Sequence, residues 1–84
     1  MEVSLNIEIG EVGSIDKSVT AINLVEGFLK ANYKVKNVVG IVYVDSQDNV
    51  SLTIACDIKN FSNSAERIQN TIRNIVKESL DEQG

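Results

Sequence analysis

The sequence contains no histidine and a single cysteine, Cys56. Histidine is the commonest general base, and serine–histidine and cysteine–histidine nucleophiles both require it. Most zinc sites also use histidine or several cysteines, so one cysteine with carboxylates makes a poor set of ligands. No other grouping of residues suggests catalysis. We therefore expect a protein that is not an enzyme and that holds no cofactor and no metal.

The single cysteine and the lack of long apolar runs also indicate the cellular compartment. A lone cysteine cannot form a disulfide bond within the chain, which agrees with a reducing compartment, and Cys56 is expected to be a small buried core residue. Residues 1–4 have no basic segment before their apolar residues, unlike a secretory signal. No apolar run approaches the roughly 18 residues of a membrane-spanning helix. We expect a cytoplasmic protein without direct membrane insertion.

Proline is absent as well, so Gly, Asn, Asp and Ser must form the turns. The 12 acidic residues outnumber the 8 basic ones, and the formal net charge is −4. This charge disfavours broad contact with a phosphate backbone or with anionic lipid. With 43% apolar and 24% charged residues, the chain has the composition of one small folded domain that spans residues 1–84.

Three segments have the apolar patterns of β-strands. Apolar and polar residues alternate over residues 3–9 and over residues 49–58, as in strands that bury one face. Residues 38–44 are apolar at nearly every position, which is typical of a central strand with both faces at least partly covered. Residues 45–49 form a polar turn, so the second and third strands make a hairpin. In the third strand, the predicted buried residues are Val50, Leu52, Ile54, Cys56 and Ile58.

Two other segments have apolar residues at spacings of three and four, which is the period of an amphipathic helix. The first helix follows Ser14, a predicted N-cap, and Gly27 inside it is expected to mark a close approach of another backbone. Its apolar stripe consists of Ile15, Val19, Ile22, Val25, Phe28 and Leu29. The second helix follows Asn63, which has the capping-box spacing to Glu66. The second stripe consists of Ala65, Ile68, Ile72, Ile75, Val76 and Leu80.

The predicted order is strand, helix, strand, strand, helix. A strand and a helix that are each apolar on one side must cover one another or a partner. We therefore expect an α+β fold of two layers, with two helices packed on one face of a three-stranded, mostly antiparallel sheet. The other face carries small and polar residues and is left for water or a second subunit; it includes Ser51, Thr53, Ala55 and Asp57.

Asp45, Asp48 and Asp57 place carboxylate oxygens near the hairpin turn, and calcium binds such ligands. A calcium loop needs alternating acidic ligands closed by a glutamate, and that spacing is missing. Because Asp and Asn are common in turns for geometric reasons alone, we interpret this segment as a turn.

An alternative function is nucleic-acid binding in the manner of a KH domain. Residues 10–13 match the Gly-x-x-Gly loop that clamps a nucleic-acid backbone in KH domains, although Glu11 would repel phosphate. Basic residues interleaved with an aromatic ring can neutralise and stack on a single strand. The simpler interpretation is a turn and a solvated loop. The contacts in this alternative would be Gly10, Gly13, Lys30, Tyr33, Lys34 and Lys36.

Outside its apolar stripe, the second helix has a face of mixed charge and amide groups. The simplest interpretation is a solvated surface, but such a face can also bind a protein partner. The candidate docking residues on it are Gln69, Asn70, Arg73 and Lys77.

Asn60 precedes the second predicted helix, and that helix contains Ala65, Ile68, Gln69, Ile72, Ile75 and Val76. In these residues and their spacings, residues 60–76 resemble the alkaline shock protein family, the small envelope-stress proteins of Gram-positive bacteria. The hairpin over residues 41–58 and the helix start over residues 15–19 also fit the layout of that family, so the resemblance covers residues 10–79. Asp57 and Ile58 stand where the family usually has Tyr-Gly. We expect a short variant without the usual C-terminal strand.

The resemblance implies a non-enzymatic, stress-related interaction or scaffold module at the cytoplasmic side of the cell envelope. Its partners would be copies of itself in a homo-oligomer, or a membrane-anchored protein. The resemblance carries over no catalytic residue. Asn60 and Gln69 are the matching polar positions, and we expect a helix-entry hydrogen bond and a partly exposed amide there.

Overall fold

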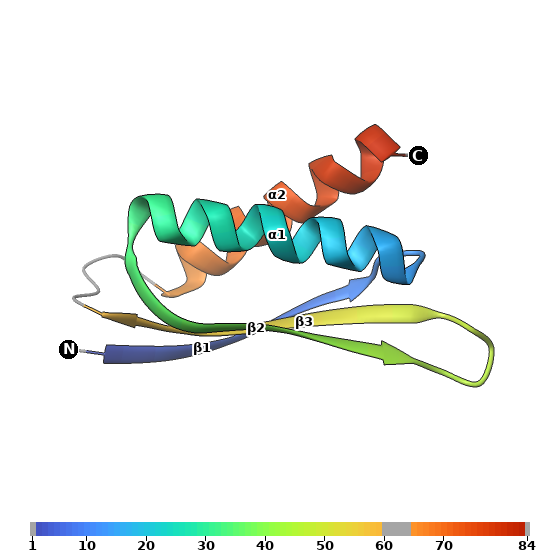
Figure 1. The fold of residues 1–84 in the computed structure, drawn as a ribbon, viewed down its shortest axis with the longest axis horizontal. Helices are drawn as coiled ribbons and strands as arrows, with labels where there is room; N and C mark the ends of the chain where they lie inside the picture. The colour runs from blue at the N-terminus through green and yellow to red at the C-terminus, as the bar shows by residue number, and fades with distance from the viewer. Residues whose placement is uncertain (1, 60–64, 84) are drawn as a thin grey trace.

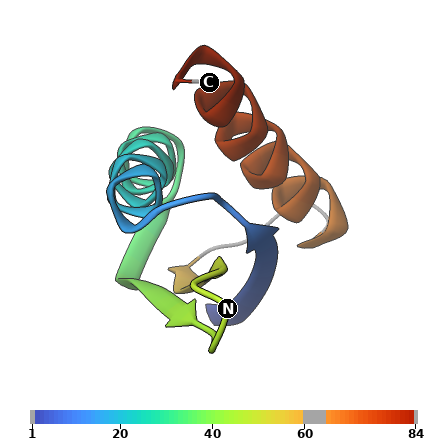
Figure 2. The same cartoon turned by 90° about the vertical axis from the view of Figure 1, so that its right-hand side faces the viewer.

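The computed structural model describes residues 2–59 and 65–83, which fold into two layers (Figure 1). The elements are β1 (Glu2–Glu11), α1 (Ile15–Asn32), β2 (Lys34–Val44), β3 (Val50–Lys59) and α2 (Ala65–Gln83). The strands form one antiparallel sheet in the order β1-β3-β2. Both helices cover the same face of this sheet, with α1 on the β2 side and α2 on the β1 side (Figure 2). The predicted α+β fold and its element order are confirmed.

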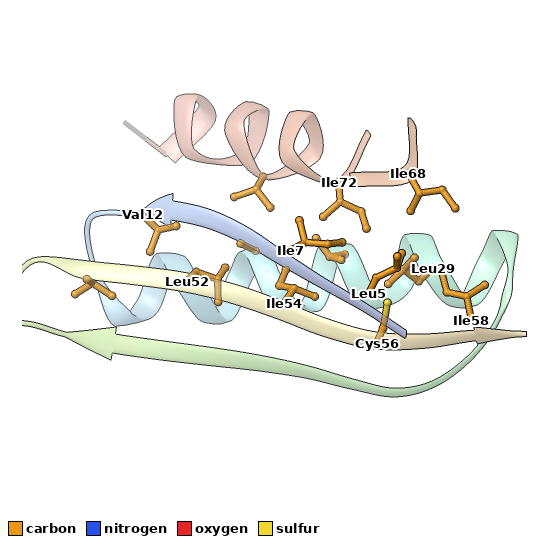
Figure 3. Close-up of a cluster of buried hydrophobic side chains, with 14 residues drawn as sticks. Leu5, Ile7, Val12, Leu29, Leu52, Ile54, Cys56, Ile58, Ile68 and Ile72 are labelled. Atoms are coloured by element: carbon orange, nitrogen blue, oxygen red, sulfur yellow. The ribbon is translucent and has the colours of Figure 1, made fainter. Parts of the chain in front are cut away.

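The central strand is β3, and its inner face forms the middle of the core (Figure 3). The five side chains predicted to be buried there are all buried. They include Cys56, and burial raises the pKa of its thiol. The other buried apolar residues come from β1, from the residue after it and from both helices: Leu5, Ile7, Val12, Ala21, Val25, Leu29, Ile68, Ile72 and Val76.

The prediction that residues 38–44 form a central strand is wrong, because β2 is an edge strand. It pairs with β3 on one side, and no strand of the described residues lies on its other side. An apolar run shows that both faces of a strand avoid polar groups, but it does not show what covers those faces. Most of this run is exposed: Val39, Ile41, Val42, Tyr43 and Val44.

The first helix starts as predicted, since the Ser14 Oγ accepts a hydrogen bond from the Lys17 N–H at 3.1 Å. Its buried face is rotated from the predicted stripe, however. Ile15 and Val19 are 56% and 49% exposed, and the residues that face the core are Ser18, Ala21, Val25 and Leu29. The buried Ser18 hydroxyl donates to the carbonyl of Ile15 at 2.6 Å, so a polar side chain is accommodated in the core.

Close approach between α1 and the sheet occurs at Gly40 of β2 and not, as predicted, at Gly27. A Cβ on Gly40 would overlap Cδ1 and Cγ1 of Ile22 and would lie 3.3 Å from its Cγ2. A Cβ on Gly27 would have no heavy atom within 4 Å. The absence of a side chain at Gly40 therefore allows Ile22 to sit directly on β2.

The apolar stripe of α2 is confirmed, with Ile68, Ile72 and Val76 buried and its other members half-buried against the core. Asn60 and Asn63, which were expected to start this helix, lie outside the described residues. Neither helix of the described residues is long and apolar enough to cross a membrane.

We predict that Gly40→Ala lowers the free energy of unfolding by about 1–3 kcal/mol, the usual cost of adding a carbon to a packed contact. The new Cβ would overlap Ile22, which has one strongly preferred χ1 rotamer in a helix and cannot easily turn aside. Denaturant unfolding measures the change.

Gly27→Ala is the matched control, because this open helical position should gain about 1 kcal/mol from the same substitution. Equal effects of the two substitutions, or a Gly40→Ala cost that persists in an Ile22→Ala background, would contradict the close contact.

Candidate functional site

The exposed large apolar side chains belong to β2 and to α1, the helix that packs on β2. Among the described residues, eight large apolar side chains are exposed, and five of them belong to β2. Isolated exposed apolar side chains are ordinary, but a contiguous group of them marks an interaction surface. The remaining three lie on α1: Ile15, Val19 and Leu24.

The apolar side chains of β2 point to both faces of the sheet. Paired residues of an antiparallel sheet point to the same face, and Val42 pairs with Leu52, which is buried beneath the helices. Val42 and Val44 therefore point toward the helix layer. The alternate residues point to the open face: Val39, Ile41 and Tyr43.

Two residues of α1 extend this surface above the strand. α1 and β2 run in opposite directions (Figure 1), and Ile22 sits over Gly40. From Ile22 back to Val19 the helix axis advances by about 4.5 Å. From Gly40 to Val42 the strand advances by about 6.6 Å in the same direction. Val19 therefore lies close to the level of Val42, and Ile15 lies one turn farther toward the end of β2. We call residues 38–44 with Ile15 and Val19 the β2 edge surface.

The backbone of β2 has hydrogen-bonding groups that point away from the sheet. Val50 pairs with Val44, and the Val50 carbonyl accepts a hydrogen bond from the Val12 N–H at 2.9 Å on the opposite side of β3. The backbone groups of Val50 and Val44 therefore point away from each other. Because these directions alternate along an antiparallel pair, Gly40 and Val42 also direct their N–H and C=O groups to the outer edge.

The other edge of the sheet, β1, is protected against a further strand. Natural edge strands resist pairing through charged residues, bulges and covering groups. β1 carries Glu2, Glu8 and Glu11, and its register shifts between Glu8 and Gly10. The Arg73 Nε also donates to the Glu8 carbonyl at 3.2 Å, so one edge acceptor is already used.

On β2, the same kinds of protection are confined to the first five residues, 34–38. Lys34 and Lys36 carry charge, and the register shifts between Lys36 and Val39. Asn37, inside this bulge, has a φ of 56°, a left-handed conformation that asparagine tolerates well. Residues 39–44 follow the bulge and contain no charge. The unprotected part of the edge is therefore the part that exposes apolar side chains.

Asp57 holds the bulge in place from the open face of the sheet. Its carboxylate accepts hydrogen bonds from the Ser4 Oγ at 2.6 Å and from the Asn37 Nδ2 at 3.0 Å. These two hydrogen bonds lower the pKa of the Asp57 carboxyl. All three strands are thus connected by polar contacts at the irregular half of β2, and the straight half is left open.

The predicted turn after β2 is confirmed, and Asp45 forms its polar centre. The carboxylate accepts hydrogen bonds from the Gln47 N–H at 2.8 Å, the Asn49 N–H at 3.0 Å and the Asn49 Nδ2 at 3.1 Å. Its pKa is lowered, mainly by the Asn49 backbone. Within residues 2–59 and 65–83, no group of three or more Asp, Glu, Cys or His side chains is placed to hold a metal ion.

The two parts of the predicted nucleic-acid surface lie at opposite ends of α1. The glycine loop precedes this helix of 18 residues, which is about 27 Å long, and the basic residues follow at its far end. Val12, between the two glycines, is buried. The structure therefore does not bring the loop (Gly10, Gly13) together with the basic group (Lys30, Tyr33, Lys34, Lys36).

Lys59 adds to the positive charge at the beginning of β2, although it is distant from Lys34 and Lys36 in the sequence. It pairs with Lys34, and the nearby Lys36 ammonium lowers the pKa of Lys59. Only the strand register reveals this proximity. At the other end of β2 lies the turn that contains Asp45 and Asp48. The strand thus has a basic end and an acidic end.

The predicted docking residues of α2 share an outer face, where Asn70, Arg73 and Lys77 are exposed and Gln69 is half-buried. Arg73 already makes hydrogen bonds within the chain, because its Nε donates to the Glu8 carbonyl and its Nη1 lies 3.5 Å from the Asn70 Oδ1. Arg73 and Lys77 also line a hollow of about 230 Å³, whose other lining residues are Ile9, Glu11, Val76 and Leu80.

Comparisons with protein-family models, with curated proteins and with solved structures find no match to this chain. The resemblance to the alkaline shock protein family therefore stays a prediction. Of its two polar positions, Asn60 lies outside the described residues and Gln69 is half-buried on α2.

We predict that Ser4→Ala raises the pKa of Asp57 toward the ordinary carboxyl value, because it removes the hydrogen bond that lowers this pKa most. The carboxyl carbon shift of Asp57, followed by NMR as a function of pH, measures the change. Since the folded-state pKa is depressed, the Asp57 contribution to stability is present above the unfolded-state pKa of about 3.9. It is lost as pH falls through the folded-state pKa.

Ser4→Ala should therefore weaken the pH dependence of unfolding in this acidic range. Ser51→Ala, on the same face at the far end of β3, is the control and should leave the pKa of Asp57 unchanged. An Asp57 pKa that does not respond to Ser4→Ala would show that the contact is not formed in solution.

Proposed function

We propose that this chain is a non-enzymatic protein-interaction module that binds a strand of another polypeptide along β2. One observation carries the proposal: of the eight exposed large apolar side chains among the described residues, all except Leu24 belong to the β2 edge surface. The outward backbone groups lie along the same residues. An added strand supplies main-chain hydrogen bonds and apolar contacts together, which is how peptides bind to open sheet edges.

Charge favours a protein partner over nucleic acid or lipid. The net charge of −4 opposes attraction to polyanionic surfaces. Residues 38–44 are uncharged, and the lysines that precede them occupy only one end of the strand. A surface whose main feature is an apolar strand edge is best matched by an apolar strand.

The resemblance of residues 60–76 to the alkaline shock protein family supports a more specific role. We extend the proposal to a stress-related scaffold at the cytoplasmic side of the cell envelope. In that role, the β2 edge surface joins copies of the chain or recruits it to a membrane-anchored protein.

We predict that a photo-reactive amino acid in place of Tyr43 forms covalent adducts with protein when cells that produce the chain are irradiated. Tyr43 is 67% exposed and lies within the β2 edge surface. Leu24 is the matched control, because it is also apolar and 46% exposed but lies outside that surface. Denaturing electrophoresis with detection of the chain measures both yields.

Adducts from position 43 in clear excess over position 24 would support the proposal, whether the adduct contains a second copy or another protein. An absence of adducts at position 43, or equal yields at both positions, would contradict it.

A further inference from the structure

We infer that the occupant of the β2 edge surface is β2 of a second copy, paired antiparallel about a two-fold axis at Ile41. This inference rests on the proposed function and specifies its partner. The two sheets would join into one continuous sheet with both helix layers on the same face. Three observations support the second copy over an unrelated strand: the charges at the two ends of β2, the position of its unprotected segment, and the half-buried Ile22 above Gly40.

The charges of β2 are complementary to themselves. Lys34 and Lys36 lie at its beginning, and Asp45 and Asp48 lie in the turn after its end. A two-fold antiparallel pair places the basic end of each copy beside the acidic turn of the other, twice. A parallel pair would place like charges side by side, which is unfavourable. The charge pattern therefore selects both the partner and the direction.

The unprotected segment sets the register. Ile41 is the midpoint of the apolar residues 38–44, of which residues 39–44 follow the bulge. A two-fold axis at Ile41 therefore pairs the regular part of this segment, residues 39–43, with the same residues of the second copy. The backbone groups of Gly40 then meet those of Val42 in the second copy, and both sets point to the outer edge, as a hydrogen-bonded pair requires. Between these hydrogen-bonded pairs, Ile41 lies opposite Ile41 of the second copy in a non-hydrogen-bonded pair, where side chains lie closest.

The same register covers apolar surface on both faces of the sheet. On the open face, Val39 lies opposite Tyr43 of the second copy. On the helix face, Val42 of the second copy lies opposite Gly40, where Ile22 occupies the space that a side chain would fill. Ile22, which is only half-buried in one copy, would be covered by that valine. Assembly would stop at two copies, because both outer edges of the joined sheet are β1 strands, which are protected against further pairing.

The first test is disulfide formation between copies that each carry one new cysteine on β2. Ile41→Cys should form a disulfide dimer under mild oxidation, because a non-hydrogen-bonded antiparallel pair has Cα atoms about 4.5 Å apart, within disulfide range. The unsubstituted chain is the background control, because its Cys56 is buried and the pKa of that thiol is raised.

Val39→Cys and Tyr43→Cys supply the matched controls. In the inferred register, position 39 of one copy and position 39 of the other are offset by four residues, or about 13 Å along the strands, and the same holds for position 43. Neither variant should therefore form a disulfide dimer by itself. A mixture of the two variants should cross-link, because Val39 lies opposite Tyr43. Equal dimer yields from all three single variants, or none from Ile41→Cys in a folded variant, would overturn the inferred pair.

The second test uses sedimentation of the unsubstituted chain over a range of concentrations. A monomer–dimer equilibrium is expected, and Lys34→Glu should raise its dissociation constant by about 2- to 30-fold through two equivalent surface contacts. Lys77→Glu makes the same charge change on α2 and should leave the dissociation constant unchanged.

A chain that stays monomeric at every concentration, while position 43 still forms photo-adducts with another protein, would overturn the second copy as occupant and leave the proposed function standing. Loss of those adducts as well would refute both. An equal response to Lys34→Glu and Lys77→Glu would contradict the charge match between the ends of β2.

Discussion

Five side chains of β3 alternate into the space beneath α1 and α2, and the rest of the fold follows from burying them (Figure 3). Each fully buried aliphatic side chain stabilises the folded state by about 1.5–3 kcal/mol. Their burial requires a neighbouring strand on both sides of β3 and a helix layer above it. With three strands, this arrangement leaves two edges, so the central strand accounts for the core and also for the existence of an open edge.

The two edges of the sheet differ in how well they are protected against pairing with a further strand. On β1, glutamates, a bulge and the contact from Arg73 oppose a further strand. On β2, Asp57 holds a bulge in the first part of the strand, and the apolar remainder has no such device. Gly40 brings α1 close at one point, but the start of that helix still leaves Ile15 and Val19 exposed. The molecule is therefore apolar where its backbone is open, a combination that suits a strand from another chain.

The sequence predicts β3 and α2 well, because strict alternation in β3 and a single apolar stripe in α2 each allow one orientation. It fails at β2 and α1 for a shared reason. Apolar residues that face the core and those that face an absent partner look the same in a sequence, so Val42 suggested a central strand and Val19 a core stripe. Apolar periodicity does not indicate which residues of two strands lie opposite each other. The sequence therefore does not show that Lys59 lies beside Lys34. The misassigned residues coincide with the candidate site.

Amide hydrogen exchange of β2, followed residue by residue as protein concentration rises, tests the central claim most directly. Ile41 and Tyr43 direct their N–H groups toward β3, whereas Gly40 and Val42 direct theirs outward. We predict that Gly40 and Val42 exchange rapidly in dilute solution and become as protected as Ile41 at high concentration. Rapid exchange of Gly40 and Val42 at every concentration would contradict the inferred pair, since no second strand would then occupy the open edge.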